Sequence, residues 1–310
     1  MTASAPTSAL ARHPRGIDHL VVAVRDLEAG REVWQKLGFT MTPRATHPWG
    51  TCNTLAQLDQ CFIEVLSVAD PALIKPATKR SFSFGAFNRG FLRKREGGSM
   101  LVLESADADA DIADIAARGL QTFRRFDFER QARQPDGETA RVAFSLAFTQ
   151  APGTTASGFF TCQQHEPQNF WHKAYQRHAN SATTVRSVAF VTRNPAEYHC
   201  FLKDFAGVDA LRATSAGIVA ETPRGDIEIL TPAAFASFYG GEAVDNRGHD
   251  LDMRAVTFAV AEFGAAAASL VAGGLPVIDH RDTLIVPASA ALGLTVAFRA
   301  ARRSSHSPDK

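Results

Sequence analysis

Two polar side chains stand inside apolar stretches of the sequence. His19 lies in GIDHLVVAV, residues 16–24, and Glu64 lies in FIEVL, residues 62–66. A carboxylate in such a strand is costly to bury unless it meets a cation, hydrogen-bond donors or water. A buried imidazole is either a neutral core group bonded to a backbone carbonyl or a ligand for a metal ion. Both residues therefore have a chemical and a structural interpretation.

The elements that position these residues form a unit that recurs along the chain. The first strand is followed by Asp26, a helix N-cap, and by a helix that ends at Gly38. Three strand-like segments complete the unit. The same order of strand, helix and strands recurs in residues 99–164, 184–231 and 253–300. This repetition predicts an α+β fold of four βαβββ units, arranged as two pseudo-symmetric half-barrel halves.

The repeat divides the chain into two predicted halves. Residues 16–180 form the first half and residues 181–302 the second, while residues 1–15 and 303–310 are expected to be disordered. An insertion, residues 68–98, follows the first unit and contains the aromatic, glycine-bearing stretch SFSFGAFNRGF. This insertion is either a flap over a cavity or a packed surface loop.

Composition and cysteine spacing argue against several classes of protein. The formal net charge of +1 gives no general attraction to nucleic acid or to an anionic membrane. No stretch approaches the roughly 20 apolar residues of a membrane helix. Cys52, Cys61, Cys162 and Cys200 lack paired CxxC spacing, which indicates reduced thiols in a cytoplasmic protein, mostly as core filler. Phosphate-loop, GxGxxG and HExxH motifs are absent, so the expected partner is a small-molecule substrate.

Three stretches resemble the glyoxalase-like proteins of bacteria: GIDHLVVAVRDLE, HPWGTCNTLAQLDQCFIEVLSV and FFTCQQHEPQNFWHKAYQRHANSA. Together with the βαβββ repeat and the histidine in its first strand, they are similar to the vicinal oxygen chelate superfamily. That superfamily includes glyoxalase I, bleomycin-resistance proteins and extradiol dioxygenases. The resemblance covers essentially the whole chain. It specifies the fold more closely than the reaction, because one scaffold hosts several chemistries.

The resemblance implies a metal site formed by the first and last strands of paired units. His19 has the first-strand position of unit one and Glu64 its last-strand position, and these strands are expected to be neighbours. In unit two the first-strand position falls near Met100, but the last strand carries Gln163 and His165 on one face. His19, Glu64 and His165 are thus the expected ligands of a divalent iron, manganese, zinc or nickel ion. A capping role or an exposed position is an equally good interpretation of His165. In that case Gln163 would replace His165 as a metal ligand.

The second half departs further from this pattern. The position of His19 is held by Ser187 in unit three and by Ala255 in unit four. Glu228 matches Glu64 but has lost its histidine partner. We therefore expect no metal in the second half, which mainly supports the fold.

Further residues are expected to contact a substrate. His47 and Trp49 lie near a turn in ATHPWGTCN, which ends at Asn53, and His47 is interpreted as a substrate contact at the mouth of the cup. Gln163 is the fourth expected contact. For His47 a purely structural role is the alternative.

The expected function is that of a glyoxalase- or dioxygenase-type enzyme that depends on a divalent metal. The ion would act as a Lewis acid on a small molecule with adjacent oxygens, and Glu64 would be both a ligand and the catalytic carboxylate that moves a proton. The alternative is a metal-free binding or resistance protein of the same fold, supported by Met100 and by 22 phenylalanines that can line a cavity. A second alternative is an enzyme that uses only acid–base residues. A homodimer is also compatible with the sequence.

Overall fold

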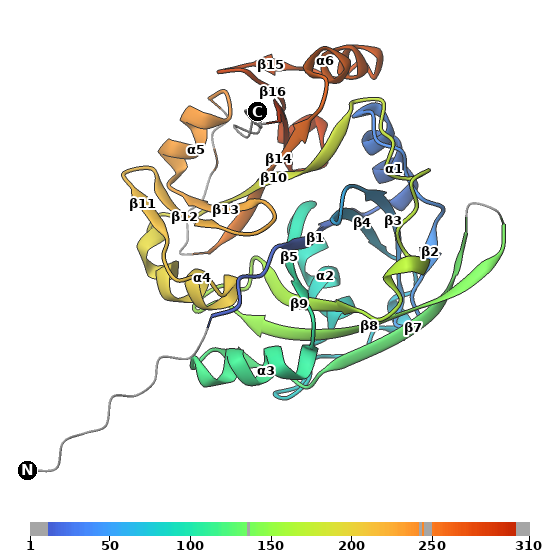
Figure 1. Ribbon diagram of the computed structural model, residues 1–310, viewed down its shortest axis with the longest axis vertical. Helices are drawn as coiled ribbons and strands as arrows, with labels where there is room; N and C mark the ends of the chain where they lie inside the picture. Colours follow the sequence, from blue (N-terminus) through green and yellow to red (C-terminus); the bar gives the residue numbers. More distant parts are fainter. Residues whose placement is uncertain (1–11, 135–136, 242–243, 245–249, 302–310) are drawn as a thin grey trace, which may run out of the picture.

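Each half of the chain builds one mixed β-sheet (Figure 1). The computed structural model describes residues 12–134, 137–241, 244 and 250–301. The first sheet has the order β2 (Ala45–Thr46), β3 (Thr51–Gln57), β4 (Phe62–Val68), β1 (Ile17–Ala23), β5 (Gly97–Ser105), β9 (Gly158–Gln164), β8 (Thr139–Gln150) and β6 (Gln121–Thr122), with β7 (Phe126–Arg133) paired to β8. The second sheet has the order β11 (Arg212–Thr214), β12 (Gly217–Glu221), β13 (Asp226–Leu230), β10 (Ala182–Val191), β14 (Asp252–Val260), β17 (Thr295–Ala300), β16 (Thr283–Val286) and β15 (Ile278–Asp279).

Short helices connect the strands. The α-helices are α1 (Leu27–Lys36), α2 (Phe84–Leu92), α3 (Ala108–Ala117), α4 (His199–Ala206), α5 (Pro232–Phe238) and α6 (Phe263–Ala272), and 3-10 turns cover Pro71–Leu73, Pro167–Asn169, Pro195–Tyr198 and Ala288–Ala290. Over the described part of the chain, none of the helices has the length and apolar character to span a membrane.

The order of these elements confirms the predicted α+β fold of four βαβββ units. Strands β1, β5, β10 and β14 open the units, and each is followed by a helix. The last strand of each unit, namely β4, β9, β13 or β17, then pairs in parallel with the first strand of the same unit. The hairpin strand β7 is an addition to unit two.

The first helix shows why the local sequence folds in this way. The Asp26 side chain accepts hydrogen bonds from two amides of the first turn and caps α1. Trp34 and Leu37 are buried on the inner side of the helix. Gly38 follows the last turn with a φ of +91°, a left-handed conformation that is easy only for glycine.

The two faces of β1 contribute to different clusters of side chains. Leu20 and Val22 belong to a large apolar core that also contains residues of the second half, such as Phe258. On the other face, Val21 joins an aromatic cluster within the first half. The His19 ring stacks on Phe62 of that cluster, with 4.2 Å between the ring centroids. The central strand thus holds the halves together with one face and forms the inside of the cup with the other.

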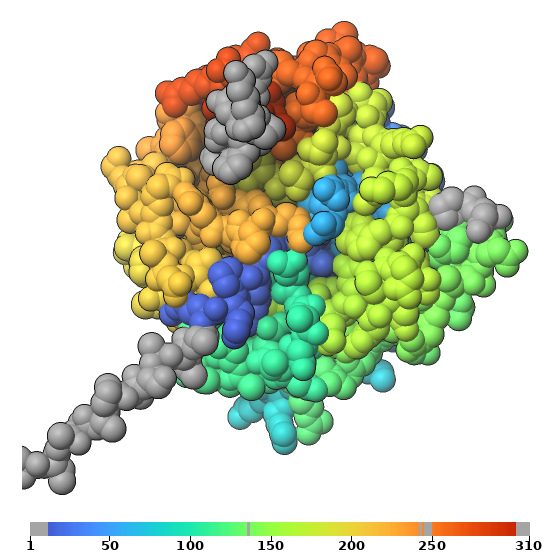
Figure 2. Space-filling view, in the orientation of Figure 1, coloured from blue at the N-terminus to red at the C-terminus, as the bar shows by residue number. Residues whose placement is uncertain are grey.

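The N-terminal segment also joins the two halves. The buried Arg15 guanidinium bonds to Asp111 of α3 at 2.8 Å, and the Arg15 amide donates to the carbonyl of Ala206 at the end of α4. Figure 2 shows this segment, in blue, between the yellow and the green parts of the molecule. The structure describes residues 12–15 of the predicted lead-in, and there Arg12 pairs with Asp204 as Arg15 does with Asp111. Residues 1–11, and the predicted tail at 303–310, lie outside the described residues.

Asn180 anchors the linker between the halves. Its side-chain amide donates to the Leu37 carbonyl at 2.8 Å, and its side-chain oxygen accepts from the Ala182 amide at 2.9 Å. The residue is fully buried. One side chain therefore bonds the end of α1 in the first half to the start of β10 in the second.

We expect Asn180→Ala to destabilise the protein by at least about 2 kcal/mol, since each buried polar group left unpaired costs about 1–3 kcal/mol. Urea unfolding measures the change. The control is Asn194→Ala, which removes an exposed asparagine bonded to Glu197 and is expected to change stability by about 0.5 kcal/mol or less. Equal stability of the two variants would contradict the role given to Asn180.

Candidate functional site

His19 and Glu64 lie next to each other at the centre of the first sheet. Strand β1 runs parallel to β4, and the register puts Val21 opposite Glu64. Atom Nε2 of His19 is 3.9 Å from Oε2 of Glu64. Both side chains are buried, with 5% and 6% of their surface exposed, and both line a cavity of about 50 Å³. The structure thus brings the two residues into one cavity.

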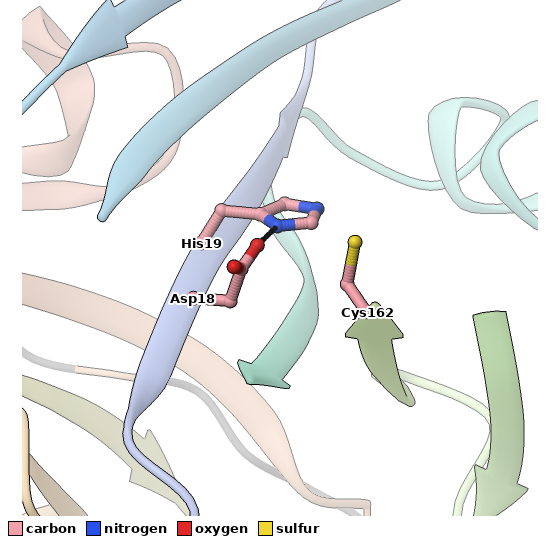
Figure 3. Close-up of side chains that lie close together, drawn as sticks. All are labelled: Asp18, His19 and Cys162. Carbon is pink, nitrogen blue, oxygen red and sulfur yellow. Dashed lines mark hydrogen bonds and ion pairs between the residues drawn. The ribbon is translucent and has the colours of Figure 1, made fainter. Parts of the chain in front are cut away.

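A β-bulge adds Asp18 to this pair. In the pairing of β1 with β5, Ile17 lies opposite Leu103 and His19 opposite Val102, so Asp18 is an extra residue in β1. Its Oδ1 lies 2.5 Å from Nδ1 of His19, and Figure 3 marks the contact between the two side chains. A carboxylate in this place accepts a hydrogen bond from the Nδ1–H of His19, which leaves the lone pair of Nε2 on the cavity side.

Asp18 was missed at the sequence level, and strand periodicity explains why. Consecutive residues of a regular strand point to opposite faces, so a neighbour of His19 is expected to point away from it. The second oxygen of Asp18 accepts a hydrogen bond from Gln164 at 2.9 Å, which holds the carboxylate in place. The only local hint is the acidic residue beside the histidine.

Glu64 is held by a donor from the neighbouring strand. Asn53 of β3 donates its side-chain amide to Oε1 of Glu64 at 2.5 Å. Burial raises the pKa of Glu64, whereas the nearby His19, Asn53 and Arg130 act in the opposite direction. The carboxyl group is therefore more basic than an exposed glutamate while its other oxygen, Oε2, stays on the His19 side.

His47 extends this network and is neutral at pH 7. Burial lowers the pKa of His47 to about 3, and the Arg130 charge adds to the effect. Its Nδ1 lies 2.8 Å from the Thr51 hydroxyl, and its Nε2 lies 3.3 Å from the amide nitrogen of Asn53. Among the described residues the side-chain oxygen of Asn53 is buried without a hydrogen-bond partner. That oxygen is available to a bound ligand or ion.

Aromatic rings form most of the cavity wall. They are Trp49, Phe62, Phe84, Phe128, Phe144, Phe160 and Phe170. The predicted contacts His47, Trp49 and Asn53 all line the cavity. Phe84 comes from α2, so the insertion after unit one closes part of the cavity with a helix. Trp49 stacks on His47 with 4.6 Å between ring centroids, and its indole nitrogen is buried without a partner in the described structure.

The last strand of unit two places different residues in the cavity from those expected. His165 lies beside the Ser145 hydroxyl at 2.9 Å, and Gln163 bonds to the backbone of Ala106 and Ala108. Neither residue lines the cavity. The expectation that His165 or Gln163 joins His19 is therefore corrected: both share one face of β9, as alternation requires, but it is the outer face.

Strand β9 places Cys162 in the cavity beside Phe160. Its sulfur, a ring nitrogen of His19 and a carboxylate oxygen of Asp18 all lie within 4.8 Å of one another (Figure 3). Burial raises the pKa of the Cys162 thiol, and the charges of Asp18 and Glu64 raise it further. The prediction that Cys162 is mostly core filler rests on the absence of paired CxxC spacing, which does not show that the side chain faces a cavity.

The corresponding strands of the second half have different chemistry. Ser187 pairs with Asp226 in the position where His19 pairs with Phe62, and Glu228 lies opposite Ala189. Burial raises the pKa of Glu228 to about 7. The second half thus keeps the glutamate, here half-buried, but has no imidazole beside it at the matching position.

We expect His47 to make the protein acid-sensitive. A histidine whose pKa falls from 6.5 to about 3 on folding gives stability that is present above pH 6.5 and is lost as the pH falls towards 3. The loss amounts to about 2 kcal/mol at pH 5. Unfolding midpoints of wild type and His47→Gln between pH 7 and pH 5 test this, and the variant should show the shallower decline. Parallel declines would show that His47 is not the sensitive group.

Comparisons with known proteins identify the family and agree with the fold. The model of the glyoxalase-like domain family matches residues 17–205. A hypothetical protein from Staphylococcus aureus has a similar structure, with a TM-score of 0.66 and 12% identity over 93% of this chain and 100% of that one. A fusion of a xylose isomerase-like TIM barrel with a 4-hydroxyphenylpyruvate dioxygenase matches 96% of this chain and 51% of its own, with a TM-score of 0.53 and 13% identity.

A methylmalonyl-CoA epimerase complex matches 49% of this chain and 96% of its own, with 17% identity and a TM-score of 0.36. No curated protein matches the sequence. At these identities the structural neighbours establish the fold alone, whereas the family model covers more than half of the chain. The chain belongs to the glyoxalase-like domain family.

Proposed function

We propose that the chain is a metal-dependent enzyme that acts on a small molecule with two adjacent oxygens. The observation that supports this most directly is the approach of His19 and Glu64 to 3.9 Å in a buried cavity. A lone pair and a carboxylate oxygen at this separation can both reach one ion with ligand bonds of about 2.0–2.2 Å. The resemblance to a superfamily in which divalent metals are common is consistent with it.

The donor set of the cavity fits a divalent ion. His19 offers Nε2 and Glu64 offers Oε2, while Cys162 offers a sulfur within 4.8 Å of the imidazole. An imidazole, a carboxylate and a thiolate together suit zinc, and a coordinating thiol loses its proton even when burial opposes this. Asp18 supplies the outer carboxylate that orients a ligating histidine. His165 has no part in this proposed set.

A bound ion would polarise an oxygen of the substrate as a Lewis acid. The chain's own residues do the remaining work. Asp18 keeps the proton of His19 on Nδ1, and Asn53 fixes one oxygen of Glu64. When Oε2 of Glu64 is not bound to the ion, this oxygen, made more basic by burial, can take a proton from a substrate carbon beside a polarised carbonyl. The aromatic wall limits the access of water, which strengthens these interactions.

Metal binding tests the proposal. Untagged protein is stripped with a chelator, dialysed and titrated with Zn²⁺, and we expect one ion per chain. Asp18→Asn should weaken affinity by about 10–100-fold, as is usual for the outer partner of a ligating histidine. His19→Ala and Glu64→Gln remove a ligand and should weaken it by more. Cys162→Ser should abolish the thiolate-to-metal absorption of the Co²⁺-loaded protein.

The matched control is His165→Ala, which removes a histidine from the outer face of the same sheet and should bind zinc like wild type. Failure of the wild type to take up a stoichiometric ion would overturn the proposal. So would equal affinity of wild type and His19→Ala. Binding of an apolar compound by a protein without metal would then favour the metal-free alternative.

A further inference from the structure

Arg130 lies between the aromatic cavity and a larger, more polar chamber. The chamber has a volume of about 290 Å³ and shares Asn53, Leu55, Arg130 and Phe170 with the aromatic cavity. Arg130 belongs to β7, in which every second side chain is the less exposed one. It therefore continues the inward row of Phe126 and Phe128. A cation in such a row is costly unless something compensates its charge.

No ion pair compensates Arg130 within the described residues. Its Nε is buried without a hydrogen-bond partner, and its guanidinium interacts with Glu64 only through the longer-range attraction between their charges. Other arginines that are equally or more buried are paired: Arg15 with Asp111 and Arg95 with Asp252. Burial lowers the pKa of Arg130, which is the sign of a cation held in poorly solvated surroundings.

The chamber outside Arg130 is positively charged. Arg44 and Arg133 line it together with Arg130, and its lining within the described residues contains no aspartate or glutamate. A concave surface of one sign raises the local concentration of ions of the opposite sign. The approach to the cavity therefore favours a small anion.

The space on the inner side of Arg130 is suited to the apolar part of a ligand. Beyond the guanidinium, the cavity is walled by rings such as Phe128, Phe144 and Phe160. The buried indole N–H of Trp49 lies in the same wall and lacks an acceptor in the described structure. Two donors without partners, Arg130 Nε and Trp49 Nε1, thus border an aromatic space that leads to His19 and Glu64.

We propose that the cavity binds a small monocarboxylic acid, with the carboxylate on Arg130 and the apolar body against the aromatic wall, towards His19 and Glu64. A planar carboxylate matches the fork of the guanidinium, and its negative charge compensates that of Arg130. The inner volume of about 50 Å³ favours a short body. The placement of the reacting part of the substrate near His19 and Glu64 rests on the proposed function. Binding of the carboxylate to Arg130 does not require a metal ion.

Pairs of acids and their neutral amides test this recognition. Calorimetric titrations use 2-oxobutyrate, 2-methylpropanoate and phenylacetate, each against its amide, with protein stripped of metal. The members of a pair have similar shapes and differ in charge, and 2-oxobutanamide keeps the adjacent oxygens. We expect the wild type to prefer the acid in at least one pair by about tenfold or more, as a charged hydrogen-bonded contact allows.

Variants of Arg130 test whether this residue causes the preference for the acid over its amide. Arg130→Gln should remove it and weaken acid binding by about 10–100-fold, whereas Arg130→Lys should keep part of it, because the charge remains and the fork is lost. The control Arg124→Gln removes an exposed arginine that lines neither cavity, and it should bind like wild type. Far-ultraviolet circular dichroism and thermal melts establish that each variant is folded.

Two results would overturn the inference: no preference for the acid in any of the three pairs, or acid binding by Arg130→Gln that equals that of wild type. The outcome is separable from that of the metal proposal. Acid binding that depends on Arg130, in a protein that takes up no zinc, supports this inference and contradicts the metal proposal. Zinc uptake that depends on His19, with acid and amide bound equally, does the reverse.

Discussion

The pairing of β1 with a parallel strand on one side and an antiparallel strand on the other is the constraint on which the rest of the structure depends. The register with β4 puts Glu64 beside His19, and the bulge in the register with β5 turns Asp18 towards the same imidazole. The apolar face of the same strand packs in the core shared with the second half. A shift of one residue in either pairing would exchange the two faces and destroy both the core and the cavity.

The polar groups of the cavity form one connected system because none of them can be buried alone. Glu64 needs the amide of Asn53, and that amide lies between Glu64 and a neutral His47. The charge of Arg130 favours the ionised form of Glu64 and the neutral form of His47. Such a network costs stability unless every member is satisfied. Three groups that line the cavity lack a partner among the described residues, namely the side-chain oxygen of Asn53, the indole nitrogen of Trp49 and Nε of Arg130. This pattern is typical of a site prepared for a ligand.

At α2, tertiary packing outweighs the low helix propensity of the local sequence. The segment Phe84–Leu92 contains aromatic, glycine and asparagine residues that are poor helix formers, and its sequence suggested a flap or a loop. It folds as α2 because Ser83 caps the first turn and because Phe84 and Phe91 are buried. The tertiary environment stabilises this helix, and through it the insertion gives one ring to the cavity wall.

The sequence by itself determined the four βαβββ units and the strands that carry His19 and Glu64, because hydrophobic periodicity and caps are local properties. It also determined that Gln163 and His165 share a face, but not which face. Only the tertiary structure decided that β9 turns Cys162 into the cavity, that a bulge brings in Asp18, and that Arg130 lies at its edge. Each of these depends on the register and curvature of strands that are far apart in the sequence, and a single sequence contains no direct record of such pairing.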